Sequence, residues 1–259
     1  MKKVGWICLL FVCMFMLCSC GGNEAKRYEK ALALFANQQY DEAAAAFEKL
    51  KDYGQAEQYA TYSKGLVLYE QSRYYEAEPY FEKTRGFMLA DQRYCYCCAW
   101  RYSDELNWQA AYEQYTLLAD YEDAASQAAY CKAYLAEQNG DYENALYAYE
   151  EAGDVRDASE RLLNLRMQVY QMAIEKKQTE DYKTAIMYFN ALGDYLSSAD
   201  QAVECKKMYR EQEYTSADRL YAEGRFEDAY RHFSALGSYR DAAQRAEELA
   251  IQLGIEETE

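Results

Sequence analysis

The sequence predicts an all-α fold built from repeated helix pairs, and three observations support this prediction. The 259-residue chain contains one proline and 12 glycines, too few turn signals for a β-sandwich, in which they recur every few residues. Alanine and tyrosine dominate its apolar residues. An aromatic–Ala–aromatic pattern also recurs with spacing i, i+3, i+7, which places all three side chains on one face of a helix. Helices are therefore expected throughout.

The first residues differ in character from the rest of the chain. Lys2 and Lys3 form a basic start, residues 4–17 are an uncharged and mostly apolar run, and Leu-Cys-Ser-Cys20 follows. A basic start, a short apolar core and small residues before the cut are typical of an export signal. An uncleaved anchor helix is the alternative, but the run is shorter than the roughly 20 residues that span a bilayer.

The Leu-Cys-Ser-Cys ending resembles the lipobox of bacterial lipoproteins. This resemblance implies cleavage before Cys20, which then receives diacylglycerol and often an N-acyl chain. Two or three acyl chains make a stable membrane anchor. We therefore expect a signal peptide at residues 1–19. Residues 20–26 would hold the lipidated cysteine and a short tether.

The repeated pattern begins at six aromatic residues. Each has Ala three positions later and another aromatic seven positions later. The six are Tyr40, Tyr74, Trp108, Tyr142, Tyr182 and Phe226. They are 34, 34, 34, 40 and 44 residues apart. Each is expected to open the shorter helix of a pair, helix B. The two longer intervals predict that the last two helices A are extended by about two to three turns.

The segment between helix B and the next helix A carries cap signals. Asp or Ser stands twelve residues after five of the first aromatics, and we expect these residues to cap helix A: Asp52, Asp120, Asp154, Asp194 and Ser238. Asp123, Asp157 and Asp241 would add negative charge to its first turn. Gly153, Gly193 and Gly237 are expected to end helix B with a left-handed backbone.

Helix A carries two further regular positions. A small residue stands nine positions before each first aromatic, which predicts close packing of another helix. A tyrosine stands twelve positions before each one, and we call this set the tyrosine ladder: Tyr28, Tyr62, Tyr96, Tyr130, Tyr170 and Tyr214.

A 34-residue helix–turn–helix period resembles the tetratricopeptide repeat. The resemblance covers roughly residues 27–250, although Asp-Tyr or Gly-Asp-Tyr replaces the proline that closes helix B in that family. It implies a right-handed α-solenoid of about six helix pairs, followed by a capping helix from Tyr239 to about Ile251. The repeat array would span residues 27–253, and residues 254–259 would form an acidic tail.

The tyrosine ladder has two interpretations. In the tetratricopeptide family this position lines the concave face that holds peptides, so the ladder would form a binding groove, and aromatic faces also stack on sugar rings. Alternatively, the ladder packs between helices, with its hydroxyls bonded to backbone or water. The constant register favours packing, because a binding surface needs differences between repeats.

Composition excludes several functions. The net charge of −16 argues against nucleic acid and against an anionic membrane surface. The single histidine, His232, is expected on the surface of a helix B, so no His-based triad forms within one chain. Because no nucleophile–base pair, phosphate loop or metal set emerges, we expect neither an enzyme nor a cofactor or metal.

Residues 94–100 read Tyr-Cys-Tyr-Cys-Cys-Ala-Trp. In the repeat frame Cys97 is equivalent to Cys131 and Ser63, which predicts a slot for a small side chain inside the fold. Cys95 and Cys98 share a helix face, so a metal site is the minor alternative. No histidine or second Cys-x-x-Cys completes its ligands.

These features together predict a lipid-anchored scaffold or adaptor on the extracytoplasmic side of a bacterial membrane. It would bind a protein or peptide partner in a helical-repeat groove and contact the membrane through its N-terminal lipid. The alternative is a cell-wall or glycan-binding lipoprotein that uses its tyrosine-rich surface.

Overall fold

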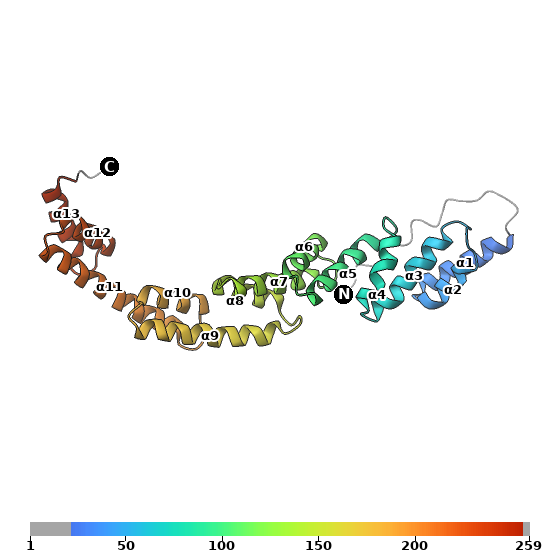
Figure 1. Cartoon of the computed structure of the whole chain (residues 1–259), viewed down its shortest axis with the longest axis horizontal. Coiled ribbons are helices and arrows are strands. Elements are labelled where there is room, and N and C mark those ends of the chain that lie inside the picture. The colour runs from blue at the N-terminus through green and yellow to red at the C-terminus, as the bar shows by residue number, and fades with distance from the viewer. Residues whose placement is uncertain (1–21, 256–259) are drawn as a thin grey trace. The chain divides into compact units, whose positions relative to one another are not determined.

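The computed structural model describes residues 22–255, and within this range it contains thirteen α-helices and no strand (Figure 1). The chain divides into two compact units, one ending at Ala124 and one beginning at Ala125. Within each unit, consecutive helices pack against each other. The prediction of an all-α solenoid is therefore confirmed. The predicted signal peptide, Cys20 and residues 256–259 lie outside the described residues.

The first unit contains three helix pairs. Its helices are α1 (Gly22–Ala36), α2 (Tyr40–Glu48), α3 (Ala56–Glu70), α4 (Tyr74–Lys83), α5 (Ala90–Asp104) and α6 (Trp108–Leu118). Helix α1 begins at Gly22, within the predicted tether. Most of residues 20–26 thus belong to the first helix.

The second unit holds the remaining helices. They are α7 (Ala124–Gln138), α8 (Tyr142–Ala152), α9 (Ala158–Gln178), α10 (Tyr182–Leu192), α11 (Ser198–Ala222), α12 (Phe226–Leu236) and α13 (Ala242–Leu253). Helices α9 and α11 have 21 and 25 residues, whereas α3, α5 and α7 each have 15. The extra six and ten residues match the two longer repeat intervals, so the predicted extension of helix A is confirmed.

Every helix B begins at the aromatic residue predicted from the repeat. Side-chain caps help to fix three of these starts: the side chains of Asn107, Asp141 and Asp181 each accept a hydrogen bond from the backbone N–H three residues later, at 3.2–3.3 Å. Such a bond satisfies one of the N–H groups that a helix start leaves without a partner.

The predicted caps of helix A were wrong. Helices α3, α7, α9, α11 and α13 begin four residues beyond them. An additional turn separates helix B from helix A: the N–H of Ala56 donates to the carbonyl of Tyr53 at 3.1 Å, and Ala90 bonds to Phe87 in the same way at 3.0 Å. A residue with positive φ, such as Met88 at 49°, lies inside this turn.

The predicted glycines do end helix B at positive φ, but not in the left-handed helical conformation that was expected. Gly153, Gly193 and Gly237 all have positive φ, with ψ near −120°. Ala119 holds the same position after α6, with φ 48° and ψ −114°. That region of backbone space is natural for glycine only, so Ala119 is strained.

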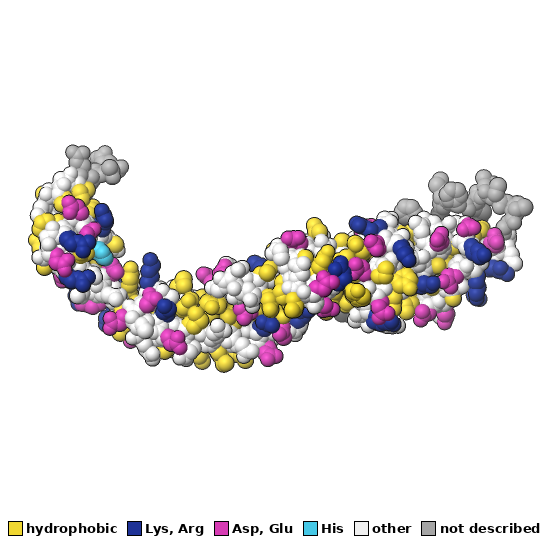
Figure 2. Space-filling view, in the orientation of Figure 1, with side chains coloured by type: hydrophobic (Ala, Val, Ile, Leu, Met, Phe, Trp, Pro, Cys, Tyr) yellow, Lys and Arg dark blue, Asp and Glu magenta, His cyan; other side chains and the backbone are white. Residues whose placement is uncertain are grey.

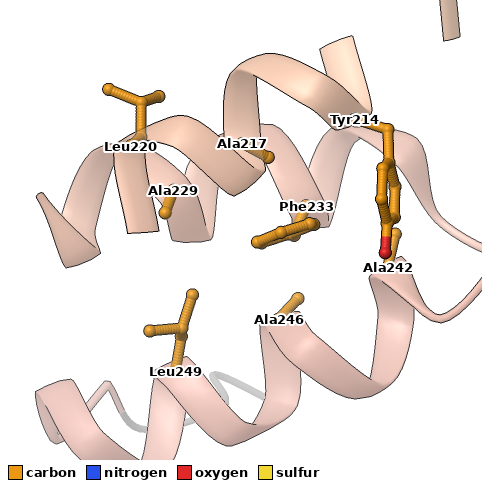
Figure 3. Close-up of a cluster of buried hydrophobic side chains, with 8 residues drawn as sticks. All are labelled: Tyr214, Ala217, Leu220, Ala229, Phe233, Ala242, Ala246 and Leu249. Carbon is orange, nitrogen blue, oxygen red and sulfur yellow. The ribbon is translucent and has the colours of Figure 1, made fainter. Parts of the chain in front are cut away.

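The last helix pair illustrates how the core is built (Figure 3). Phe233 of α12 is fully buried between Ala217 of α11 and Ala246 of α13. The small residues let the neighbouring helices approach the ring closely, as the repeat predicts. In the second pair the residue equivalent to Ala217 is Gly65, where a Cβ atom would lie 2.9 Å from the ring of Phe81.

Among residues 22–255, no helix combines the length and the apolar character that crossing a membrane requires.

Candidate functional site

The tyrosine ladder lies inside the helix packing. Tyr62, Tyr96, Tyr130 and Tyr214 are buried, and Tyr28 and Tyr170 are half-buried. All six rings meet the second aromatic of their own helix B edge to face, with 5.5–5.9 Å between ring centroids. One example is Tyr130 against Tyr149 at 5.9 Å. The ladder is therefore packed against helix B.

The ladder hydroxyls join each helix pair to the next one. In four repeats the hydroxyl bonds to the side chain of the residue 27 positions later, directly before the next helix A: Tyr96 to Asp123, Tyr130 to Asp157, Tyr170 to Ser197 and Tyr214 to Asp241. Tyr62 instead accepts a hydrogen bond from the backbone N–H of Leu89, also 27 residues on. We call this contact the tyrosine latch.

The latch changes the ionisation of both its partners. Burial, together with the hydrogen bond to Asp157, raises the pKa of Tyr130 to about 12. Burial pushes the pKa of Asp157 upward, but the hydrogen bond from Tyr130 and the charge of Arg161 outweigh it and lower that pKa. The hydrogen bond from Tyr214 likewise lowers the pKa of Asp241. These two aspartates are therefore charged acceptors at neutral pH.

The latch was not predicted from the sequence, although a signal for it is present. Residue type alone predicts that Asp123, Asp157 and Asp241 add charge to the first turn of helix A. Each instead stands directly before that helix and accepts a hydrogen bond from a tyrosine hydroxyl. The constant separation of 27 residues is visible in the sequence.

The second unit contains an open cleft of about 670 Å³ between helices α8, α9 and α10, which we call the α8–α10 cleft. Its lining residues are Glu143, Asn144, Leu146, Tyr147 and Glu150 of α8, Arg166 of α9, and Asn190 to Tyr195 at the end of α10. Helix α8 also contacts α10 directly, and Tyr142 meets Tyr188 edge to face at 6.0 Å.

Carboxylates dominate the α8–α10 cleft. Glu143, Glu150 and Asp194 face a single cation, Arg166, which forms an ion pair with Glu150. Acidic residues are also concentrated nearby in sequence, since residues 125–155 contain six carboxylates and one basic residue, Lys132. The cleft therefore has a negative electrostatic potential that favours cationic groups.

The α8–α10 cleft also offers exposed apolar surface. Among its lining residues, Tyr147 is 57% exposed. Leu163 and Met167 of α9 and Met187 of α10 are also about half exposed, but they lie outside the lining. Figure 2 shows hydrophobic side chains gathered over the region of α8, α9 and α10, interrupted by charged ones. Acidic and apolar groups side by side suit a segment that carries both basic and apolar residues.

The cysteines of residues 94–100 lie within one turn of α5. Cys97 and Cys131 are fully buried, as is Ser63 at the equivalent position, so the predicted slot for a small side chain is confirmed. Burial raises the pKa of the Cys97 thiol. Among the described residues, no group of three or more His, Cys, Asp and Glu side chains is arranged to hold a metal ion.

His232 lies on α12, half-buried, and is the cyan side chain in Figure 2. Its Nδ1 atom is 2.7 Å from Oε2 of Glu213 on α11. This pairing joins two neighbouring helices of the last helix pair.

Comparison with known proteins adds no assignment. No protein-family model matches the chain, and no curated protein matches its sequence.

Proposed function

We propose that this protein is a lipid-anchored scaffold on the extracytoplasmic side of a bacterial membrane, and that it holds a basic protein segment in the α8–α10 cleft. The observation that carries the proposal is the cleft itself. It combines three carboxylates with the exposed ring of Tyr147 on rigid helices. Repeat arrays commonly use such surfaces to hold partners. The membrane anchor is proposed from the lipobox-like sequence that ends at Cys20.

The glycan-binding alternative depends on open tyrosine faces. The ladder supplies few of them, since four of its rings are buried and two are half-buried. We therefore favour a protein segment as the partner.

A panel of matched peptides tests the cleft. Fluorescence anisotropy would compare peptides of net charge about +4, 0 and −4 that share the same apolar residues. We expect only the basic peptide to bind. The variant Glu143→Lys should weaken its binding by about tenfold, because it reverses one charge at the cleft.

The matched control is Glu227→Lys. Glu227 follows the first aromatic of α12 as Glu143 follows that of α8, and it is exposed outside the cleft. Equal affinity for all three peptides, or equal loss in both variants, would refute the cleft as the binding site. Retention of purified cell wall by the wild-type protein, with no peptide binding, would favour the glycan alternative.

The anchor is tested separately. Replacement of Cys20 by Ala should move the protein from the membrane fraction to the soluble fraction, and unchanged fractionation would contradict lipidation.

A further inference from the structure

The first helix pair contains a second open groove, between α1 and α2, of about 720 Å³. It is lined by Arg27, Lys30 and Leu34 of α1 and by Glu42, Ala45, Ala46 and Lys49 in and directly after α2. No residue of α3 contributes to this lining. The groove is thus a basic surface with a small apolar floor.

The three cations of this groove are exposed, and no carboxylate of the described chain is in ion-pair contact with them. Within residues 22–255, none of Arg27, Lys30 and Lys49 forms an ion pair, whereas basic side chains elsewhere often do, such as Arg101 with Glu78 at 3.0 Å. The one carboxylate in the lining, Glu42, already accepts a hydrogen bond from Gln39 at 3.0 Å. The groove therefore has an excess of two positive charges.

The position of the groove suggests which anion it meets. Lys30 is eight residues beyond the start of α1 at Gly22, about 12 Å along the helix. Gly22 is two residues beyond Cys20, which adds at most about 7 Å. If Cys20 carries the anchor, Arg27 and Lys30 lie within about 20 Å of it, where phospholipid phosphates are abundant anions.

We propose that the α1–α2 groove binds the headgroups of anionic phospholipids in the membrane that carries the anchor. This inference rests on the proposed lipid anchoring. Each basic residue held near an anionic surface strengthens binding about fivefold. The excess of positive charge is confined to the groove lining, since residues 22–49 as a whole contain five carboxylates and four basic residues. Acidic residues more than about 8–10 Å from the groove weaken the attraction little, because they are screened at physiological salt. The net charge therefore does not exclude local contact with an anionic membrane.

Lysine footprinting tests the proposal on the full-length protein. The protein is added to vesicles of phosphatidylcholine alone, or with about 30% phosphatidylglycerol, and exposed lysines are acetylated and quantified by mass spectrometry. We expect acetylation of Lys30 and Lys49 to fall at least threefold on the anionic vesicles and to recover in about 0.5 M salt. Lys206 and Lys207, which are exposed on α11, should be unaffected.

Charge reversal makes the test specific. Arg27→Glu combined with Lys49→Glu should abolish the protection of Lys30, whereas Lys206→Glu combined with Arg210→Glu should leave it intact. Equal acetylation on both kinds of vesicle would overturn the proposal. A second result would also overturn it: polyglutamate added to neutral vesicles protects Lys30 as strongly as phosphatidylglycerol does. The occupant of the groove would then be an acidic protein segment.

Failure of the anchor gives a different result. The Cys20→Ala variant reports on attachment to neutral vesicles, whereas the footprint reports on the difference between lipid compositions. If the protein sediments with both vesicle types and Lys30 is acetylated equally on both, the proposed anchor is supported and the proposed lipid site in the groove is refuted.

Discussion

Removal of one latch hydroxyl should destabilise the second unit measurably. In Tyr130→Phe the ring remains, so its packing against Tyr149 is kept, and the hydrogen bond to Asp157 at 2.5 Å is lost. A hydrogen bond to a charged acceptor contributes about 1.5–3 kcal/mol. Asp157 keeps its bond from Nε of Arg161 at 3.0 Å, so we expect a loss near the lower end, about 1–2 kcal/mol.

Urea unfolding followed by circular dichroism measures this loss. The matched control is Tyr75→Phe, which removes a hydroxyl from a ring that is 72% exposed and should change the free energy of unfolding by less than about 0.5 kcal/mol. Equal midpoints for the wild-type protein and Tyr130→Phe would refute the energetic role of the latch.

A double-mutant cycle separates the latch from other effects. Tyr130→Phe and Asp157→Ala should be less destabilising together than the sum of the two, with a coupling energy of about 1 kcal/mol. Strictly additive losses would show that the two side chains act independently.

Three further predictions concern strain, burial and pH. Ala119→Gly should stabilise the protein by about 0.5–1 kcal/mol in thermal unfolding, since it relieves a backbone conformation natural for glycine, whereas Ala110→Gly in α6 should destabilise it by about 1 kcal/mol. Ser63→Cys should raise the urea midpoint, because the buried Ser63 hydroxyl has no hydrogen-bond partner among the described residues. The control is Ser103→Ala, which removes a hydrogen bond to the Ala99 carbonyl at 2.9 Å and should not raise the midpoint. The pKa of Asp157 is lower in the folded protein than its unfolded value of about 3.9. The charged carboxylate therefore stabilises the fold fully at pH values above about 3.9, and this stabilisation is lost as the pH falls through the folded pKa. Stability should therefore decline below about pH 4, and the decline should be smaller in Asp157→Ala.

The sequence was sufficient to predict the helices where side-chain periodicity determines them. The starts of all six helices B and the lengths of α9 and α11 follow from the aromatic spacing. The starts of helix A were missed because a good capping residue such as Asp154 lies in a turn whose geometry depends on backbone hydrogen bonds. Residue type identifies an Asp near the start of a helix, but it does not reveal that Tyr130 binds to Asp157.

The two open grooves depend on tertiary packing. The α8–α10 cleft lies beside the lengthened α9, and the α1–α2 groove lies between the two helices of the first pair. Periodicity predicts which face of each helix is buried, but not where neighbouring pairs leave a surface uncovered.

The latch also determines where the array tolerates changes of length. In all five latches described above, the tyrosine and its partner are 27 residues apart. The distance from a partner to the next ladder tyrosine instead rises from 7 residues, as between Asp123 and Tyr130, to 13 before Tyr170 and 17 before Tyr214. All additional residues thus fall between the start of helix A and its ladder tyrosine. In engineering terms, the 27-residue segment is a connector of fixed length and the start of helix A is an adjustable spacer, in which each added residue rotates the next repeat by about 100° around the helix axis.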